Sequence, residues 1–253
     1  MPDPSLQIAI DVLRELEDRA GPVVSTEFGG VYTSAVAPHV ESLNFVRVDY
    51  INGPIGKIVA AAREAARKYS LRTIVVDVSA GHMTSLSFEG ADARGCWERL
   101  VRGIYAWDAE PAEPSHKVEQ ISLDDYLAAQ QTFLDASPDY IPAEADGDGA
   151  AVRAFADAVT TQWWGARSNG ELVCVGELYF VDDCAQLESL STLPAWEGQG
   201  FGTAVTQARV NAAHSEGASV VFAQIEAGND ASVAVHNRVG FRHLGTRNTF
   251  ILV

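Results

Sequence analysis

The chain has 253 residues, 47% hydrophobic and 21% charged, which is typical of a folded globular protein and not of a disordered or fibrous one. Its 34 acidic and 18 basic side chains give a formal net charge of −16, which disfavours nucleic acid and anionic membranes as partners. No apolar run of about 18 residues is present, and the first 20 residues lack the order of a signal peptide. The chain has three widely spaced cysteines, Cys96, Cys174 and Cys184. This odd, sparse count fits a reducing compartment better than a disulfide framework, so a cytoplasmic protein is expected.

The first half of the chain alternates strand and helix patterns. Short β-branched segments predict strands at 23–26, 30–33 and 43–48. Apolar residues recur at three and four positions from Ile55 to Tyr69, which predicts a helix, and a buried strand is expected at 73–78. This order predicts an α/β unit.

A linker and a difference in charge divide the chain. Asp108–Ser115 contains two prolines and no apolar period, so we expect domains at 1–115 and 116–253. The first carries a net charge of −5 and the second −11, so the second should attract cations. A further loop is expected at 137–149.

The second half predicts helix, helix, three strands, helix, strand, helix and strand. Ser122 is expected to cap the first helix, with Asp125 three residues later, and Asn169-Gly170 is expected to turn a hairpin. The other boundaries are a helix at 152–159, strands at 163–167, 171–181 and 185–193, a helix from Phe201 with Gly217 at its end, a strand at 220–226, a helix capped by Asn229 or Asp230 and ended by Gly240, and a strand at 241–253.

A strand, a glycine-rich turn and a helix form the central motif of this half. Residues 197–203 read Glu-Gly-Gln-Gly-Phe-Gly-Thr, and the helix follows at once. Glycines allow close backbone approach to a ligand, and a helix N-terminus offers free N–H groups with partial positive charge. The motif therefore predicts a diphosphate site. An ordinary strand-to-helix turn is the alternative, since a Gly-x-Gly pair alone does not exclude it.

With a second motif downstream, the sequence resembles the GNAT superfamily of acetyl-CoA-dependent N-acetyltransferases. That family carries a strand ending Val-x-Pro, then Arg/Gln-x-x-Gly-x-Gly/Ala, then Asn-x-x-Ala/Ser-x-x-x-Tyr-x-x-x-Gly-Phe. In this chain the corresponding positions are Thr192-Leu193-Pro194, Gly200-Phe201-Gly202, Asn229, Ser232 and Gly240-Phe241. The resemblance covers about residues 116–253.

The resemblance implies acetyl-CoA as co-substrate, with no metal. It implies cofactor contacts from Leu190, Thr192, Gly198, Gln199, Gly200, Phe201, Gly202, Thr203, Asn229, Ser232 and His236. Two residues depart from the family pattern. Glu197 replaces the family's Arg or Gln and would repel a diphosphate unless it turns to solvent. His236 replaces a Tyr that often donates a proton to the leaving thiolate; it is a candidate acid, and packing against the cofactor is the alternative.

The implied reaction is attack of an amine on the thioester carbonyl, which needs a base to deprotonate the amine. By strand alternation Gln186, Glu188, Leu190 and Thr192 share one face, so Glu188 is a candidate base, and Glu226 at the end of the next strand is the other. Each is alternatively a solvated strand carboxylate. The resemblance assigns the backbone N–H of Thr192 to the thioester carbonyl. The cysteines lack a paired His, which disfavours nucleophilic catalysis.

The expected fold is α/β (α+β), with two GNAT-like mixed-sheet domains in tandem. The first half fits a degenerate GNAT-like copy without the glycine turn, or an unrelated α/β cap over the acceptor site. The expected activity is transfer of an acetyl group to a primary amine of a cationic acceptor, such as a polyamine, an aminoglycoside-like molecule or a peptide. A non-catalytic acyl-CoA-binding or sensor module is the alternative, and a homodimer stays open.

Overall fold

The computed structural model describes residues 3–21, 23–35, 38, 40–49, 54–76, 97–136, 149 and 152–252. The labelled helices are α1 (Pro4–Ala20), α2 (Ile55–Lys68), α4 (Leu123–Asp135), α6 (Phe201–Ser215) and α7 (Asp230–Val239). Residues 152–158 are also helical. The strands are β1 (Val23–Thr26), β2 (Gly29–Tyr32), β3 (Phe45–Val48), β4 (Thr73–Val76), β5 (Trp97–Trp107), β6 (Val118–Ile121), β7 (Thr160–Ser168), β8 (Glu171–Val181), β9 (Cys184–Thr192), β10 (Val220–Glu226) and β11 (Phe241–Leu252).

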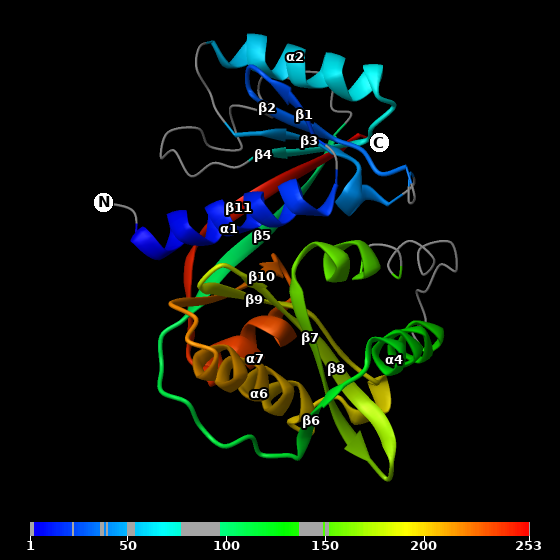
Figure 1. Cartoon of the computed structure of the whole chain (residues 1–253), viewed down its shortest axis with the longest axis vertical. Helices are drawn as coiled ribbons and strands as arrows, with labels where there is room; N and C mark the ends of the chain where they lie inside the picture. Colours follow the sequence, from blue (N-terminus) through cyan, green and yellow to red (C-terminus); the bar gives the residue numbers. More distant parts are fainter. Residues whose placement is uncertain are drawn as a thin grey trace.

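The described strands form one mixed sheet in the order β1-β2-β3-β4-β11-β5-β10-β9-β8-β7-β6. β5 belongs to the first half of the chain, yet it lies between β10 and β11 of the second half, and β11 also pairs with β4. Figure 1 shows these two long strands crossing between the upper and lower parts of the molecule. The domain boundary at residues 115 and 116 stays a prediction, and the hydrogen-bonded sheet runs across it.

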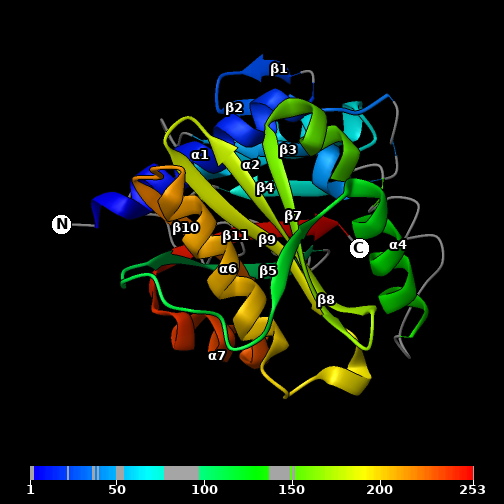
Figure 2. The same cartoon turned by 60° about the horizontal axis from the view of Figure 1, so that its bottom comes forward.

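Helices cover both faces of the sheet. On one face α6 and α7 pack against Leu178, Leu187 and Ala223, and α2 packs against the first half. On the other face α1 packs against Ile104 and Phe222, and α4 reaches the sheet through Tyr126. Figure 2 shows α4 and α6 on opposite sides of β7 to β9.

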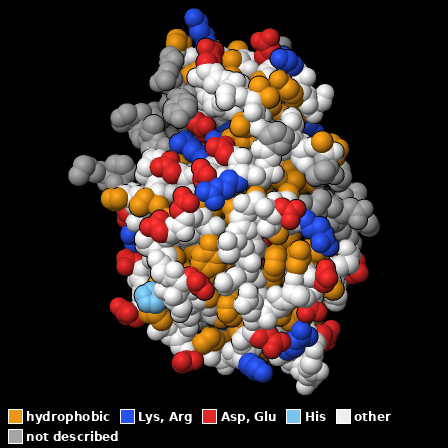
Figure 3. Space-filling view, viewed as in Figure 1, with side chains coloured by type: hydrophobic (Ala, Val, Ile, Leu, Met, Phe, Trp, Pro, Cys, Tyr) orange, Lys and Arg blue, Asp and Glu red, His pale blue; other side chains and the backbone are white. Residues whose placement is uncertain are grey.

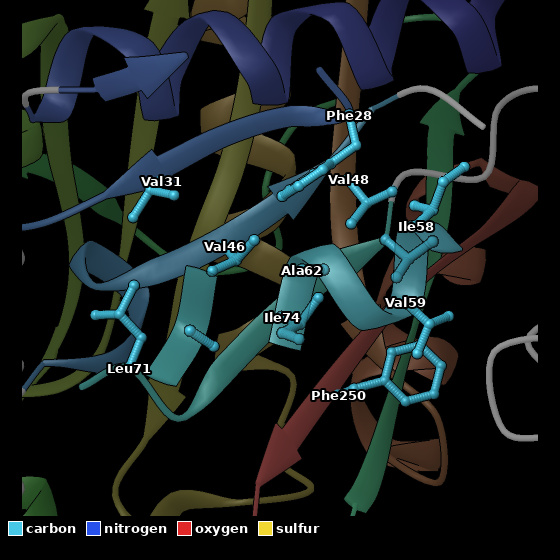
Figure 4. Packing of buried hydrophobic residues seen from close by; sticks show 12 residues of the cluster. Phe28, Val31, Val46, Val48, Ile58, Val59, Ala62, Leu71, Ile74 and Phe250 are labelled. Atoms are coloured by element: carbon cyan, nitrogen blue, oxygen red, sulfur yellow. The ribbon is translucent and has the colours of Figure 1, made fainter. Parts of the chain in front are cut away.

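The core beneath α2 explains why the predicted helix forms. Its buried residues Ile58, Val59 and Ala62 recur on one side and contact Ile74 and Phe250 of the sheet (Figure 4). Since an exposed α2 would leave this stripe in water, packing of the stripe stabilises the helix more than its intrinsic propensity does.

Most predicted elements of the second half are confirmed. Ser122 accepts a hydrogen bond from the N–H of Asp125, Asn229 accepts one from Ser232, and β10 has the predicted bounds. The helix α1 and the strand β6 were not predicted. The loop expected at 137–149, apart from Gly149, and the end of the strand expected at 73–78 lie outside the described residues.

Candidate functional site

The parallel strands β9 and β10 separate partway along their length. They pair from Cys184 opposite Val220 to Leu187 opposite Ala223, and each strand then continues without the other. Ser189 lies just beyond this point with a φ of 51°, and the register between β8 and β9 shifts there. A β-bulge on β9 therefore turns the strand away and opens a gap between the two strands.

The bulge is held by a buried arginine of α6. Nη1 of Arg209, which is fully buried, donates to the carbonyl oxygens of Glu177 and Glu188, each at 2.8 Å. A Cβ on Gly176 would lie 2.6 Å from that Nη1, so only glycine leaves room for the guanidinium. Burial lowers the pKa of Arg209 to about 10, and the side chain stays cationic at neutral pH. No role in the site was predicted from the sequence for Arg209 or Gly176.

The bulge corrects the predicted strand alternation. Cys174 lies opposite Thr192, and Glu177 lies opposite Glu188. Because β8 alternates regularly between residues 174 and 177, Thr192 and Glu188 face opposite sides of the sheet. Gln186 and Glu188 do share a face, as Nε2 of Gln186 donates to Oε2 of Glu188 at 2.6 Å. The predicted common face for 186–192 is therefore wrong beyond Glu188.

The glycine turn leads from the separated end of β9 into α6. Gly198 and Gly200 have φ values of 71° and 90°, which L side chains rarely adopt. Gly200 is the N-cap of α6, and within the described part of the chain no side chain caps this end. The N–H groups of the first turn, from Phe201 to Thr203, are thus available to an anion.

Two residues missed by sequence analysis adjoin this turn. His116, which directly follows the linker, bonds through Nε2 to the carbonyl oxygen of Gln199 at 2.9 Å, and its ring stacks on Phe201. Arg238 of α7 donates from Nη1 to Oγ1 of Thr203 at 3.4 Å. His116 braces the turn, while Arg238 places a cation beside the start of α6.

A cavity of about 1020 Å³ extends from the turn past β9 toward α1 and β4, and Thr192 and Glu188 line it from opposite sides of the sheet. Glu197, Gly198, Gly200, Gly202 and Thr203 line its end at the turn, with Leu190 and Thr192 beside them. The opposite end is lined by residues of the first half and β11, namely Leu13, Leu16, Glu17, Phe45, Thr73, Val75, Leu100, Arg102, Arg247 and Thr249. Both halves of the chain therefore build the cavity.

Two carboxylates, Glu177 and Glu188, lie side by side in the cavity wall. Glu188 is partly exposed; burial raises its pKa, while the charge of Arg102 opposes that rise. Glu177 is fully buried and accepts hydrogen bonds from the hydroxyls of Tyr126, at 2.5 Å, and Tyr179. Burial raises the pKa of Glu177 as well. Glu177 was not predicted; Tyr179 lies two residues away on β8, but Tyr126 comes from α4, which is distant in the sequence.

The other predicted site residues lie at varying distances from the cavity. Asn229 and Ser232 at the start of α7 line it, whereas Glu226 is exposed and is not among its lining residues. His236 is buried, with Nδ1 2.8 Å from the carbonyl oxygen of Ser232 and its ring against Phe241. Burial lowers the pKa of His236 to about 4, so it is neutral at pH 7, and this placement favours packing over proton donation.

Other reactive groups are few in the described part of the chain. Burial raises the pKa of the Cys174 thiol to about 11, so it carries no thiolate at neutral pH. Among the described residues, no cluster of three or more His, Cys, Asp or Glu side chains could hold a metal ion. The described helices include none that is long and apolar enough to cross a membrane.

A model of the acetyltransferase (GNAT) family matches residues 110–241 of the chain. None of the curated proteins matches the sequence.

Solved structures resemble the fold over nearly the whole chain. A GCN5-related N-acetyltransferase from Kribbella flavida has a TM-score of 0.69 and 16% identity, over 98% of this chain and 95% of that one. A functionally unknown conserved protein from Staphylococcus epidermidis ATCC 12228 has a TM-score of 0.70 and 12% identity, over 92% and 94%. A tandem GNAT protein from the clavulanic acid biosynthesis pathway has a TM-score of 0.55 and 17% identity, over 98% and 94%. The fold is thus a mixed-sheet α/β fold with two GNAT-like units in tandem.

Proposed function

Because the chain belongs to the GNAT family of acetyltransferases, we propose that it transfers an acetyl group from acetyl-CoA to a primary amine, within the cavity between β9 and β10. The observation that carries the proposal is the meeting of three features in one cavity: the separated strands, the uncapped start of α6, and Glu188. Residues 116–253 form the transferring unit in this proposal, and residues 1–115 supply part of the acceptor wall.

Acetyl-CoA fits the turn end of this cavity. The diphosphate would lie at the first N–H groups of α6, where Gly198 and Gly200 keep Cβ atoms out of the way. Arg238 offers a cation that offsets Glu197, which faces the same cavity. The thioester arm would enter the gap where β9 and β10 no longer pair.

Glu188 is the proposed general base. It lies beside the gap, it is partly exposed to the cavity, and its raised pKa brings it closer to the operating pH. Both carboxylate oxygens of Glu177 already accept tyrosine hydroxyls, which leaves Glu188 the freer of the two. In the reaction the amine nitrogen bonds to the acetyl carbon, the C–S bond breaks, Glu188 takes the amine proton, and coenzyme A leaves as thiolate.

The cavity around Glu188 is rich in hydrogen-bond acceptors. Oε1 of Gln186 and Oε1 of Gln224 are buried without a hydrogen-bond partner in the described structure, and both residues line the cavity. An amine or its ammonium form supplies the N–H donors that these oxygens lack. Figure 3 shows acidic and basic side chains interspersed over this molecular face. The formal net charge of −16 supports attraction of an ammonium from solution.

The experiment that tests this function replaces the base without changing its shape. Glu188→Gln should retain acetyl-CoA affinity, because the proposed cofactor contacts lie in the turn, and should lower thiol release with reactive amines by about 10²–10⁴-fold. The exposed Glu226→Gln is the matched control and should behave as the unaltered chain does. A loss confined to Glu226→Gln would transfer the role to that residue.

A non-catalytic sensor would already differ from an acetyltransferase in assays of the unaltered chain. It would bind acetyl-CoA tightly and release no thiol above background with polyamines, aminoglycosides, amino acids or peptide amines between pH 7 and 9. That outcome would contradict the proposed transfer and leave a binding module.

A further inference from the structure

Arg102 is a cation in the cavity wall, and no carboxylate among the described residues forms an ion pair with it. It comes from β5, the strand that the first half contributes to the centre of the sheet, and it is partly exposed. In the described part of the chain its side chain makes one hydrogen bond, from Nη1 to Oγ1 of Thr249 at 3.4 Å. Glu226 lies directly opposite Arg102 in register, yet in the described part of the chain no ion pair joins Arg102 to any carboxylate.

The neighbouring Arg247 differs from Arg102 because it contacts a carboxylate. Arg247 lies opposite Arg102 on β11 and lines the same cavity. Its guanidinium contacts both carboxylate oxygens of Glu17, Nη1 at 2.8 Å and Nη2 at 3.0 Å. In the described structure Arg247 therefore has a carboxylate in direct contact and Arg102 has none, although the charge of Arg102 acts on the nearby Glu188 without an ion-pair contact.

Polar side chains around Arg102 are placed to bind a ligand in the cavity. Thr249 holds the guanidinium from β11, and the buried hydroxyl of Thr73 on β4, 4% exposed, has no hydrogen-bond partner in the described structure although Thr73 lines the cavity. On the other side Gln224 lies diagonally across from Arg102, at a typical spacing of about 7–8 Å. The cavity thus holds hydrogen-bond donors at Arg102 and acceptors around Gln224 and Glu188.

We propose that the acceptor is an amino acid: a primary amine that also carries a carboxylate, with the amine at Glu188 and the carboxylate on Arg102. The planar guanidinium fork matches a carboxylate, and an ion pair in a secluded cavity is stronger than one at the surface. This inference rests on the proposed amine acetylation and narrows its substrate. It departs from the polyamine and aminoglycoside acceptors expected from the acidic second half, because the first half contributes this cation.

The test compares matched acceptors that differ only by the carboxylate, such as alanine with ethylamine and lysine with cadaverine. The unaltered enzyme should favour the amino acid in at least one pair by more than about 10-fold in kcat/KM. Arg102→Gln should lower kcat/KM for that amino acid by about 10²-fold and leave the carboxylate-free amine within about 3-fold. Arg102→Lys keeps the charge without the fork and should fall between the two.

Arg238→Gln is the matched control, because Arg238 also lines the cavity but lies at the cofactor end. It should raise the KM for acetyl-CoA and leave the preference between paired acceptors unchanged. Equal losses for both members of each pair in Arg102→Gln, or a preference of the unaltered enzyme for the carboxylate-free amines, would overturn the carboxylate subsite while acetylation itself stood. If no amine of either kind were acetylated, the proposed function and this inference would both fall.

Discussion

The two halves of the molecule each contain a parallel strand pair joined through a helix, and the two pairs differ within the described part of the chain. β3 and β4 pair over all four residues of each strand, from Phe45 opposite Thr73 to Val48 opposite Val76. β9 and β10 pair over four positions and then separate at the bulge. Within the described residues β3 and β4 stay paired to their ends, whereas β9 and β10 separate where one extra residue on β9 forms the bulge.

The helices that follow the two strands also start differently. α2 begins after Pro54, and α6 begins after Gly200 in the left-handed conformation, with Gly198 before it. Near the end of β3, Asp49 pairs with Nε of Arg47 at 2.8 Å and with Nε of Arg14 at 3.3 Å, so these charges already match one another. An anion would therefore be favoured at the uncapped start of α6, whereas the cations near the end of β3 already have a carboxylate partner.

Ion pairs cover part of the sheet face in the first unit, and Phe45, Thr73 and Val75 line the cavity that continues into the second unit. Arg47, 4% exposed, pairs with Glu17 and Asp18 of α1 and with Asp49, so the ionic groups there satisfy one another. Glu17 also holds Arg247 at the edge of the cavity. The comparison predicts that the second unit alone binds acetyl-CoA, while the first unit serves as scaffold and acceptor wall.

The largest expected effect on the difference between the two units comes from replacing Arg209, the buried cation that holds the bulge on β9. Arg209→Met should lower the free energy of unfolding by about 2 kcal/mol, since two carbonyl oxygens lose their donor while the cost of burying a charge is relieved. It should also weaken acetyl-CoA binding by more than about 10-fold as the opening relaxes. Urea unfolding and calorimetry measure the two effects.

The exposed Arg238→Met is the stability control for that experiment and should stay within about 0.5 kcal/mol of the unaltered chain. If Arg209→Met kept both its stability and its affinity, the opening would not depend on the guanidinium.

A smaller effect is expected at the turn, where Glu197 faces the cavity. Glu197→Gln removes a negative charge near the proposed diphosphate and should tighten acetyl-CoA binding by about 1 kcal/mol or less, because the side chain is exposed to solvent. Calorimetry at low and high salt would show the gain shrinking as salt rises. Weaker binding would instead give the carboxylate a positive role in the site.

Local signals in the sequence predicted much of the fold. Ser122, Asn229 and Gly240 mark helix ends by capping chemistry, which depends on neighbouring residues alone, and the structure confirms each. The glycines of the turn were predicted for the same reason. The missed helix α1 carries such a signal too, since Asp3 caps it and Pro4 stands at its first turn.

Features that depend on distant contacts could not be predicted. The bulge at Ser189 reversed the face expected for Thr192, and nothing in a strand of ordinary residues marks where an extra residue will lie. The placement of β5 between β10 and β11 brings Arg102 into the cavity from the first half. Arg209 and Glu177 likewise acquire their roles from partners on other elements.

The most direct test of the contrast between the two units uses a pair of equivalent glycines. Gly202 and Gly56 are each the second residue of their helices, α6 and α2. A Cβ on Gly202 would meet its nearest neighbour at 3.6 Å, an ordinary contact, and one on Gly56 would meet nothing within 4 Å. Aspartate at either position therefore adds a negative charge with no steric conflict from the Cβ itself.

Calorimetric titration with acetyl-CoA should give one site per chain in the unaltered protein. Gly202→Asp should lower the affinity by about 10²-fold or more, because the new carboxylate would face the diphosphate. Gly56→Asp should stay within about 2-fold. Unchanged affinity in Gly202→Asp, or a loss confined to Gly56→Asp, would contradict the assignment of the acetyl-CoA site to the second unit.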